Sequence, residues 1–329
     1  MTQANSKQPH LTKQTQKFVD DLEAQNAAPL YSLSYTEARN VLLNAQSQKP
    51  LPQDLACDIE DIQLPVGPTG SVDVRIFRPK GNTQKLPIMI YYHGGGWVMG
   101  DKKTHDRLVR ELTIGANVMT FFVVYTPSPE AQFPVPVEQG YAALEYIYKN
   151  ADKFNADATK IVTCGDSVGG NMTAVTAIMA KMRKGPDILK QILLYPVTSG
   201  LMNTPSYDLF ADGPWLTKKA MEYFWDAYAP NKDSRKDILA SPLLASVEQL
   251  TGLPSTFLIT DENDVLRDEG EEYGNKLMQA GNRIVSVRYN GTHHDFMMLD
   301  ALSDTCPAKA AVHQTIEMIK QAVREPLKE

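Results

Sequence analysis

The stretch Ile161-Val162-Thr163-Cys164-Gly165-Asp166-Ser167-Val168-Gly169-Gly170-Asn171-Met172 decides how we interpret the fold. An apolar run with β-branched residues ends in a Gly-x-Ser-x-Gly pattern, and an apolar helical pattern begins directly after it. We therefore expect a strand, a tight turn and a helix. The glycines beside Ser167 permit two backbones to approach closely in such a turn. The serine then stands at a helix N-terminus, where free N–H groups and the helix dipole face whatever its hydroxyl attacks.

This pattern by itself permits two interpretations. A glycine-rich turn between a strand and a helix is ordinary α/β architecture, and Ser167 could simply be part of that turn. The same pattern with strand–turn–helix context is typical of a nucleophilic serine. The rest of the chain has to decide between the two.

Composition limits the classes of protein to consider. With 329 residues, 43% of them hydrophobic and 22% charged, the chain can bury a large core, as one domain or as one domain with an inserted subdomain. Its formal net charge of −6 argues against a general nucleic-acid binder, which needs a basic surface to displace counterions from phosphates.

The N-terminus and the cysteines indicate a cellular setting. Residues 1–10 are polar and lack the apolar core of a signal peptide, and no apolar run reaches the length of a membrane span, so we expect a cytoplasmic protein. Cys57, Cys164 and Cys306 are far apart and form no C-x-x-C pair. We interpret them as reduced thiols rather than a disulfide framework or a zinc site.

Strand and helix patterns alternate through most of the chain. Ser34 and Glu37 have capping-box spacing in a helical segment before residue 50, and period-two runs between residues 58 and 77 predict an antiparallel hairpin. Strands are then expected at 88–92, 118–125, 161–164, 192–195, 256–260 and 284–289, and helices at 105–112, 135–149, 171–182 and 269–280. This order predicts a mostly parallel sheet with helices on both faces and ligands at the carboxyl ends of its strands.

One interval interrupts this alternation. Residues 198–238 contain no strand pattern, but they carry seven large apolar side chains, several of them at helical spacing: Phe210, Trp215, Leu216, Met221, Phe224, Trp225 and Tyr228. Any one of these could equally be core of this interval or touch a substrate. We expect a helical cap formed by residues 1–50 and 198–240, over a catalytic domain formed by residues 51–197 and 241–329.

The run His93-Gly94-Gly95-Gly96-Trp97 follows the expected strand at 88–92. It could be a flexible loop or a phosphate cradle, but no Gly-Lys-Ser/Thr follows, which disfavours a nucleotide P-loop. Together with a nucleophilic serine it fits an oxyanion hole better, with Gly95, Gly96 and Val168 as backbone donors. We expect His93 to brace the loop rather than to take protons.

A serine nucleophile needs a histidine base and a carboxylate that holds the tautomer of that histidine. His293 and His294 both follow the last expected strand, and their position alone does not choose between them. Four carboxylates lie in the segment 261–268, just past the strand at 256–260. Among these, Asp268 resembles a helix cap, and Asp261 or Glu262 could be solvated loop charges.

At this point the chain resembles the hormone-sensitive-lipase-like group of α/β-hydrolase esterases, from about residue 55 to the C-terminus. Its motifs stand in that group's order: 93–97, 125–134, 165–171, 264–270 and 294–296. The resemblance implies an eight-stranded α/β-hydrolase sheet with a helical cap. It assigns the acid to Asp264, the first Asp of D-x-L-R-D, and the base to His294, two residues before Phe296.

The chain departs from that group at two positions. Val168 stands where alanine is usual, and its methyl groups could narrow the pocket beside the nucleophile. Asp295 stands where glycine is common after the histidine.

Together these features predict a serine carboxylesterase with Ser167, Asp264 and His294 as its triad and no cofactor or metal. The resemblance implies a small-molecule ester with an acyl chain from acetyl to about octanoyl. A lactonase or amidase with the same triad, or a non-catalytic ligand receptor, are the alternatives. We expect activity to fall on the order of pH 6 to 7 if the base has an ordinary pKa. A homodimer through 284–289 and 308–324 is possible by resemblance.

Overall fold

The computed structural model describes residues 9–46 and 51–324. Its strands are β1 (Cys57–Leu64), β2 (Val72–Pro79), β3 (Leu86–Tyr92), β4 (Met119–Val124), β5 (Ala156–Asp166), β6 (Lys190–Leu194), β7 (Ser255–Asn263) and β8 (Ile284–His293). Its α-helices are α1 (Lys13–Ala24), α2 (Tyr35–Gln46), α3 (Asp106–Ala116), α4 (Val135–Lys149), α5 (Val168–Arg183), α6 (Pro205–Leu209), α7 (Lys218–Tyr228), α8 (Val247–Leu250), α9 (Arg267–Gln279) and α10 (Cys306–Arg324).

The strands form one eight-stranded sheet in the order β1-β2-β4-β3-β5-β6-β7-β8. β1 pairs antiparallel with β2, and β2 with β4, whereas the remaining neighbours are parallel. The expected hairpin and the mostly parallel sheet are therefore confirmed. The expected strands 161–164 and 284–289 are longer in the structure, and the carboxyl ends of β5 and β8 lie directly before Ser167 and His294.

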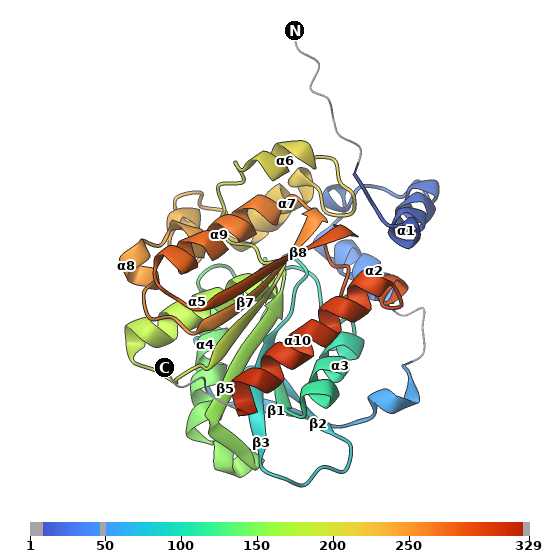
Figure 1. The fold of residues 1–329 in the computed structure, drawn as a ribbon. Coiled ribbons are helices and arrows are strands. Elements are labelled where there is room, and N and C mark those ends of the chain that lie inside the picture. Colours follow the sequence, from blue (N-terminus) through green and yellow to red (C-terminus); the bar gives the residue numbers. More distant parts are fainter. Residues whose placement is uncertain (1–8, 47–50, 325–329) are drawn as a thin grey trace.

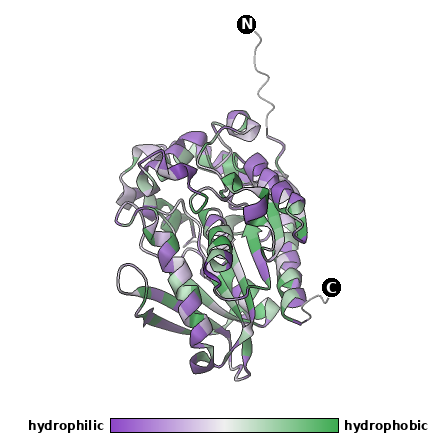
Figure 2. Ribbon diagram, turned by 90° about the vertical axis from the view of Figure 1, so that its left-hand side faces the viewer, coloured by the Kyte–Doolittle hydropathy of each residue, from purple (hydrophilic) through white to green (hydrophobic). Residues whose placement is uncertain are grey.

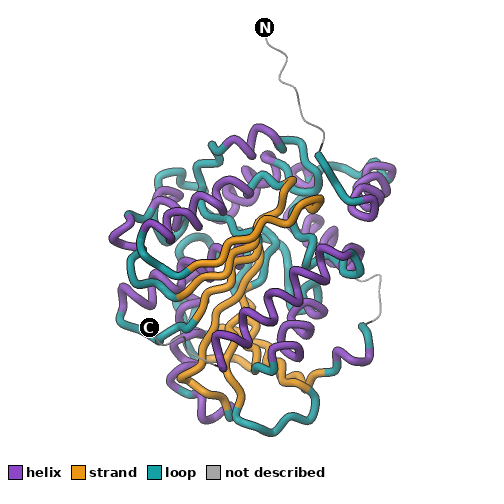
Figure 3. The backbone as a smooth tube through the Cα atoms, viewed as in Figure 1, coloured by secondary structure: helices purple, strands orange, loops and turns teal. Residues whose placement is uncertain are grey.

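Helices cover both faces of this sheet. α3 and α10 pack on one face, and α4, α5 and α9 pack on the other, as Figures 1 and 3 show. The central strands are hydrophobic in Figure 2, whereas the helices around them alternate hydrophilic and hydrophobic residues. Strands that are covered on both faces need apolar residues at successive positions, and β3, for example, is buried along nearly its whole length.

Helices α1, α2, α6 and α7 lie beyond the carboxyl ends of the parallel strands, whereas the short helix α8 packs against α9. α1 and α2 come from the N-terminal segment, and α6 and α7 come from the interval after β6, and all four lie at the same end of the sheet in Figure 1. The capping box at the start of α2 forms as expected: Ser34 N–H donates to the Glu37 carboxylate at 2.8 Å. The parts of the expected cap at 1–8 and 47–50 lie outside the described residues.

Among the helices that the structure describes, none has the length and apolar character needed to cross a membrane.

Candidate active site

Ser167 occupies the tight turn between β5 and α5, with φ 54° and ψ −120°. A side chain at either flanking glycine would collide with backbone: a Cβ at Gly165 would lie 2.2 Å from the Gly169 carbonyl oxygen, and a Cβ at Gly169 would lie 2.0 Å from that of Tyr92. The Ser167 N–H donates to the carbonyl oxygen of Leu194 at 2.8 Å, which anchors the turn on β6. The expected strand–turn–helix arrangement is therefore present, and a positive φ at a residue with a side chain marks it as strained.

Three segments that are distant in the sequence meet at this turn. The Ser167 hydroxyl lies 2.9 Å from His294 Nε2, and His294 Nδ1 lies 2.7 Å from an Asp264 carboxylate oxygen. All three side chains are buried. With Nδ1 protonated, the ring donates to Asp264 and accepts the Ser167 hydroxyl proton at Nε2, the arrangement a general base requires.

Geometry also separates the two adjacent histidines. His293 Nδ1 is 2.7 Å from the carbonyl oxygen of His294, and the His293 ring stacks on Phe18 of α1 with centroids 5.6 Å apart. Burial lowers the pKa of His293 to about 4, so this ring is neutral. Of the pair, only His294 contacts Ser167 and Asp264.

The charge of His294 depends on opposing effects. Burial favours the neutral imidazole, but the carboxylates of Asp264 and then Asp295 outweigh it and raise the pKa above its ordinary value of 6.5. The pH at which this base gains its proton therefore lies above the pH 6 to 7 that an ordinary pKa predicts.

The loop after β3 lies against the turn that holds Ser167. Gly95 and Gly96 have φ values of +103° and +65°, and a Cβ on them would meet the Met99 carbonyl oxygen at 2.5 Å and the Phe224 ring at 2.3 Å. Only glycine fits both the conformation and the space. These two glycines and Ser167 line the same cavity.

The third expected donor, Val168, is the first residue of α5, where an N–H has no acceptor within the helix. Its side chain is fully buried in the core and is not among the residues that line the cavity. The expectation that its methyl groups narrow the pocket is therefore wrong, because the side chain points into the packed interior.

His93 supports the loop, as expected. Its Nδ1 lies 2.8 Å from the carbonyl oxygen of Gly94, and its ring stacks on Tyr125 with centroids 4.2 Å apart. The Tyr125 hydroxyl donates to the His93 carbonyl oxygen at 2.9 Å. Burial lowers the pKa of His93 to about 4, which keeps this ring uncharged.

Asp166 has a role that sequence reasoning did not identify. Its carboxylate is fully buried and accepts hydrogen bonds from the Tyr91 hydroxyl at 2.7 Å and from the Gly94 N–H at 3.2 Å. It also lies 3.1 Å from His105 Nε2. Asp166 directly precedes Ser167, so its hydrogen bond to Gly94 joins the serine turn to the start of the glycine loop. A lone acid at the end of an apolar strand was the signal that could have revealed it.

The His105–Asp166 contact favours the charged forms of both side chains. Burial alone would lower the pKa of His105 and raise that of Asp166, but their mutual attraction outweighs burial and shifts both pKa values the other way. Because both side chains are fully buried, neither charge has water to replace its partner.

Two expectations about the acidic segment are wrong. Asp261 is not a solvated loop charge, since it is fully buried and burial raises its pKa well above the ordinary value. Asp268 is not a helix cap, because α9 is preceded by Leu266 and Asp268 lies in the first turn. There Asp268 accepts from the Ser206 N–H at 2.8 Å and so joins α9 to α6.

Within the described residues, Asp261, Asp264 and His294 place ligand-type atoms within 4.8 Å of one another. The direct 2.7 Å contact between His294 Nδ1 and Asp264 matches a shared proton better than a cation between them. The expected absence of a metal stays a prediction.

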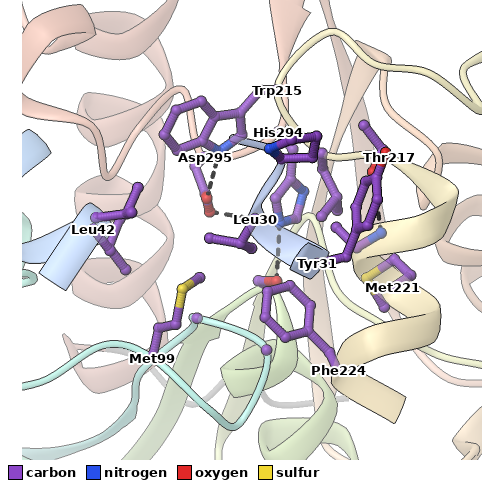
Figure 4. Close-up of a pocket in the computed structure, with 17 residues that line it drawn as sticks. Leu30, Tyr31, Leu42, Met99, Trp215, Thr217, Met221, Phe224, His294 and Asp295 are labelled. Carbon is purple, nitrogen blue, oxygen red and sulfur yellow. Dashed lines mark hydrogen bonds and ion pairs between the residues drawn. The ribbon is translucent and has the colours of Figure 1, made fainter. Parts of the chain in front are cut away.

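A cavity of about 240 Å³ opens onto the Ser167 hydroxyl. Figure 4 shows its walls, which come mainly from the N-terminal segment and from the interval after β6. Its labelled lining side chains are Leu30, Tyr31, Leu42, Met99, Trp215, Thr217, Met221, Phe224, His294 and Asp295. The walls are mainly apolar, and Ser167, His294 and Asp295 place polar groups in them.

A family model described as the alpha/beta hydrolase fold matches residues 89–298. The chain belongs to the α/β-hydrolase family. Carboxylesterase NlhH of Mycobacterium tuberculosis is 35% identical over 237 residues, which cover 71% of this chain and 74% of that protein. An esterase of Gibberella moniliformis is 36% identical over 262 residues, or 79% of this chain and 81% of that one. The crystal structure of a thermostable esterase from Pseudomonas putida matches with a TM-score of 0.93 and 40% identity, covering 97% of this chain and 99% of that one.

Proposed function

We propose that this α/β hydrolase is a serine carboxylesterase that hydrolyses esters with short acyl chains, from acetyl to about octanoyl. The observation that carries the proposal is the continuous contact from Ser167 through His294 to Asp264 at the floor of an apolar cavity. The names of the similar esterases from Mycobacterium tuberculosis, Gibberella moniliformis and Pseudomonas putida support the same activity.

In the proposed reaction, His294 Nε2 takes the proton of Ser167 as its oxygen attacks the ester carbonyl carbon. Asp264 holds the Nδ1–H and stabilises the imidazolium that forms. The carbonyl oxygen becomes an oxyanion, which backbone N–H groups of Gly95, Gly96 and Val168 stabilise.

The tetrahedral intermediate then collapses, and His294 gives its proton to the departing alcohol oxygen. The acyl group remains on the Ser167 oxygen. A water molecule, deprotonated by the same Nε2, attacks the acyl carbon, and the proton returns to Ser167 as the acid leaves. Every step uses residues of this chain, so the proposal includes no cofactor.

The cavity supports a small, apolar acyl group. Its volume of about 240 Å³ lies at or below the lower end of small-molecule sites, which span roughly 300 to 1,000 Å³. We propose that residues 1–50 and 198–240 act as its cap, since α2 and α7 carry lining residues such as Leu42 and Phe224. Excluding water by such a cap strengthens the electrostatic contacts within the site.

Replacing the nucleophile tests the proposal. Ser167→Ala is expected to lower kcat for p-nitrophenyl butyrate on the order of 10⁶-fold, as loss of a triad serine does elsewhere. The exposed strand residue Ser286 provides the control, and Ser286→Ala should retain activity. Labelling with a fluorophosphonate followed by peptide mapping should place the adduct on Ser167, and an adduct at another residue would refute the assignment.

Two related expectations stay predictions. β8 is an edge strand of the sheet, which leaves it available for pairing with a second copy, but an exposed edge does not establish a homodimer. The cytoplasmic location expected from the polar N-terminus is likewise untested.

A further inference from the structure

Asp295, the residue after the proposed base, has a backbone conformation that favours glycine over any residue with a side chain. Its φ is +69°, a region that L-residues rarely adopt and that glycine adopts freely. This chain therefore keeps a carboxylate beside His294 in spite of local backbone strain.

The two oxygens of this carboxylate have different surroundings. Oδ2 accepts a hydrogen bond from the Trp215 indole N–H at 2.9 Å, which fixes the plane of the group. Oδ1 is buried and has no hydrogen-bond donor among the described residues. It lies 3.5 Å from His294 Nε2, and Figure 4 shows the carboxylate between Trp215 and the His294 ring.

A buried acceptor without a donor is costly, and such a group in a folded protein calls for an explanation. With the imidazole proton on Nδ1, Nε2 is itself an acceptor for the Ser167 hydroxyl, which lies 2.9 Å away. Once the hydroxyl proton moves to Nε2, the ring becomes a cation 3.5 Å from Oδ1. Oδ1 therefore gains an oppositely charged neighbour whenever Nε2 carries a proton, both during the reaction and in the free enzyme at low pH.

Building on the proposed esterase function, we propose that Asp295 is a positioning residue for the base. It stabilises the His294 imidazolium from the Nε2 side, while Asp264 does so from the Nδ1 side, and Trp215 keeps Oδ1 directed at the ring. An interaction that is stronger in the charged state than in the resting state favours proton transfer.

The other carboxylates near His294 cannot replace this contact. Asp264 is already bonded to Nδ1. Asp261 is fully buried, and burial raises its pKa well above the ordinary value, which favours its neutral form. Asp166 is already bonded to His105, to the Tyr91 hydroxyl and to the Gly94 N–H.

The His293 and Tyr195 rings beside His294 carry no charge that could replace that of Asp295. Burial lowers the pKa of His293 to about 4, so this ring stays neutral. The Tyr195 ring meets His294 edge-on with centroids 5.1 Å apart, and burial raises its pKa well above the ordinary value. The pKa of Asp295 itself is raised, because burial and the Asp166 carboxylate outweigh His294, the Trp215 hydrogen bond and His105, which lower it.

The test is the pH profile of kcat/KM for p-nitrophenyl butyrate with full-length Asp295→Asn. Kcat/KM reports the protonation of the free enzyme. An opposite charge at this distance shifts a pKa by about 1 to 3 units, so its removal should move the acid limb at least about 1 pH unit lower. The amide oxygen of asparagine can still accept from Trp215, which preserves the contact with the cap.

Asp208→Asn is the matched control, because it removes one carboxylate from exposed helix α6, where Asp208 pairs with Lys218. Its acid limb should stay in place. A purely structural role of Asp295 would lower kcat or thermal stability without moving the acid limb of Asp295→Asn. An acid limb that coincides with that of the wild type would overturn the proposal.

A second measurement does not depend on turnover. In a Ser167→Ala background, the downfield NMR signal of the His294 ring N–H should titrate at lower pH when Asp295→Asn is added. Equal titration in both proteins would also refute the role of Asp295. If the wild type hydrolyses no ester and fluorophosphonate does not label Ser167, the proposed function fails separately, while this titration still reports on Asp295.

Discussion

Gly169→Ala tests how closely the turn that holds Ser167 packs against the end of β3. An alanine Cβ there would lie 2.0 Å from the Tyr92 carbonyl oxygen and 2.8 Å from the His93 carbonyl carbon. Real Cβ contacts essentially never fall below 3.0 Å, so the two backbones must separate by about 1 Å, the difference between 3.0 and 2.0 Å. Neither partner is a side chain that can rotate away.

That separation has two consequences. Inserting a methyl group into a packed interior costs about 1 to 3 kcal/mol, and backbone partners place this case at the upper end. The same movement carries Val168 and Ser167 away from Gly95 and Gly96, and a displacement of about 1 Å at a reacting centre can cost about 100-fold in rate. We therefore expect kcat/KM to fall about 100-fold in protein that still folds.

The assay combines urea denaturation with p-nitrophenyl butyrate hydrolysis and the rate of fluorophosphonate labelling. Gly274→Ala is the matched control in α9, since its nearest neighbour would be Ile284 Cδ1 at an ordinary 3.4 Å. Alanine favours a helix over glycine by up to about 1 kcal/mol, so this variant should be as stable as the wild type or more so. Wild-type activity and stability in Gly169→Ala would show that the close approach of β3 and α5 does not exist.

Three further predictions concern buried carboxylates. Asp264→Asn should lower kcat about 10⁴-fold with the fold intact, because His294 loses the acceptor that sets its tautomer; steady-state kinetics and circular dichroism check this. Asp166→Asn removes the charged partner of the fully buried His105 and should destabilise the protein by about 3 to 5 kcal/mol in urea, whereas Asn at the exposed Asp152 should change nothing measurable. Burial raises the pKa of Glu269 from 4.5 to about 8, so the folded state keeps a proton that the unfolded state releases, and stability should fall as pH rises from 4.5 towards 8. Glu269→Gln should flatten that part of the curve of Tm against pH, and an unchanged slope would contradict the raised pKa of Glu269.

Local patterns predicted most of the architecture. The hairpin, the alternation of strands and helices and the capping box at Ser34 are encoded by residues close together in sequence, so periodicity and capping chemistry suffice to find them. The predicted ends of the strands were the least accurate. The lengths of β5 and β8 depend on hydrogen bonds to neighbouring strands that are distant in the sequence.

The sequence also identified the chemical groups of the candidate site. The serine turn and the glycine loop follow from local conformation, since positive φ values and close backbone contacts admit few residue types. The choice of His294 over His293 depended on resemblance, because adjacent residues after one strand have no local feature that separates them.

The sequence alone determined which residues can supply the nucleophile, the oxyanion donors, the base and the acid. They are a serine in a strained turn, glycines in a loop, and histidines and acids after the last strands. Only the tertiary structure decided which of them meet, because contacts between β5, β7 and β8 depend on how the whole sheet assembles. It alone showed that Asp166 is paired in the interior, that Asp261 is buried, and that Asp295 faces the proposed base. Burial and partners set the charge of a carboxylate, and neither can be read from its neighbours in the chain.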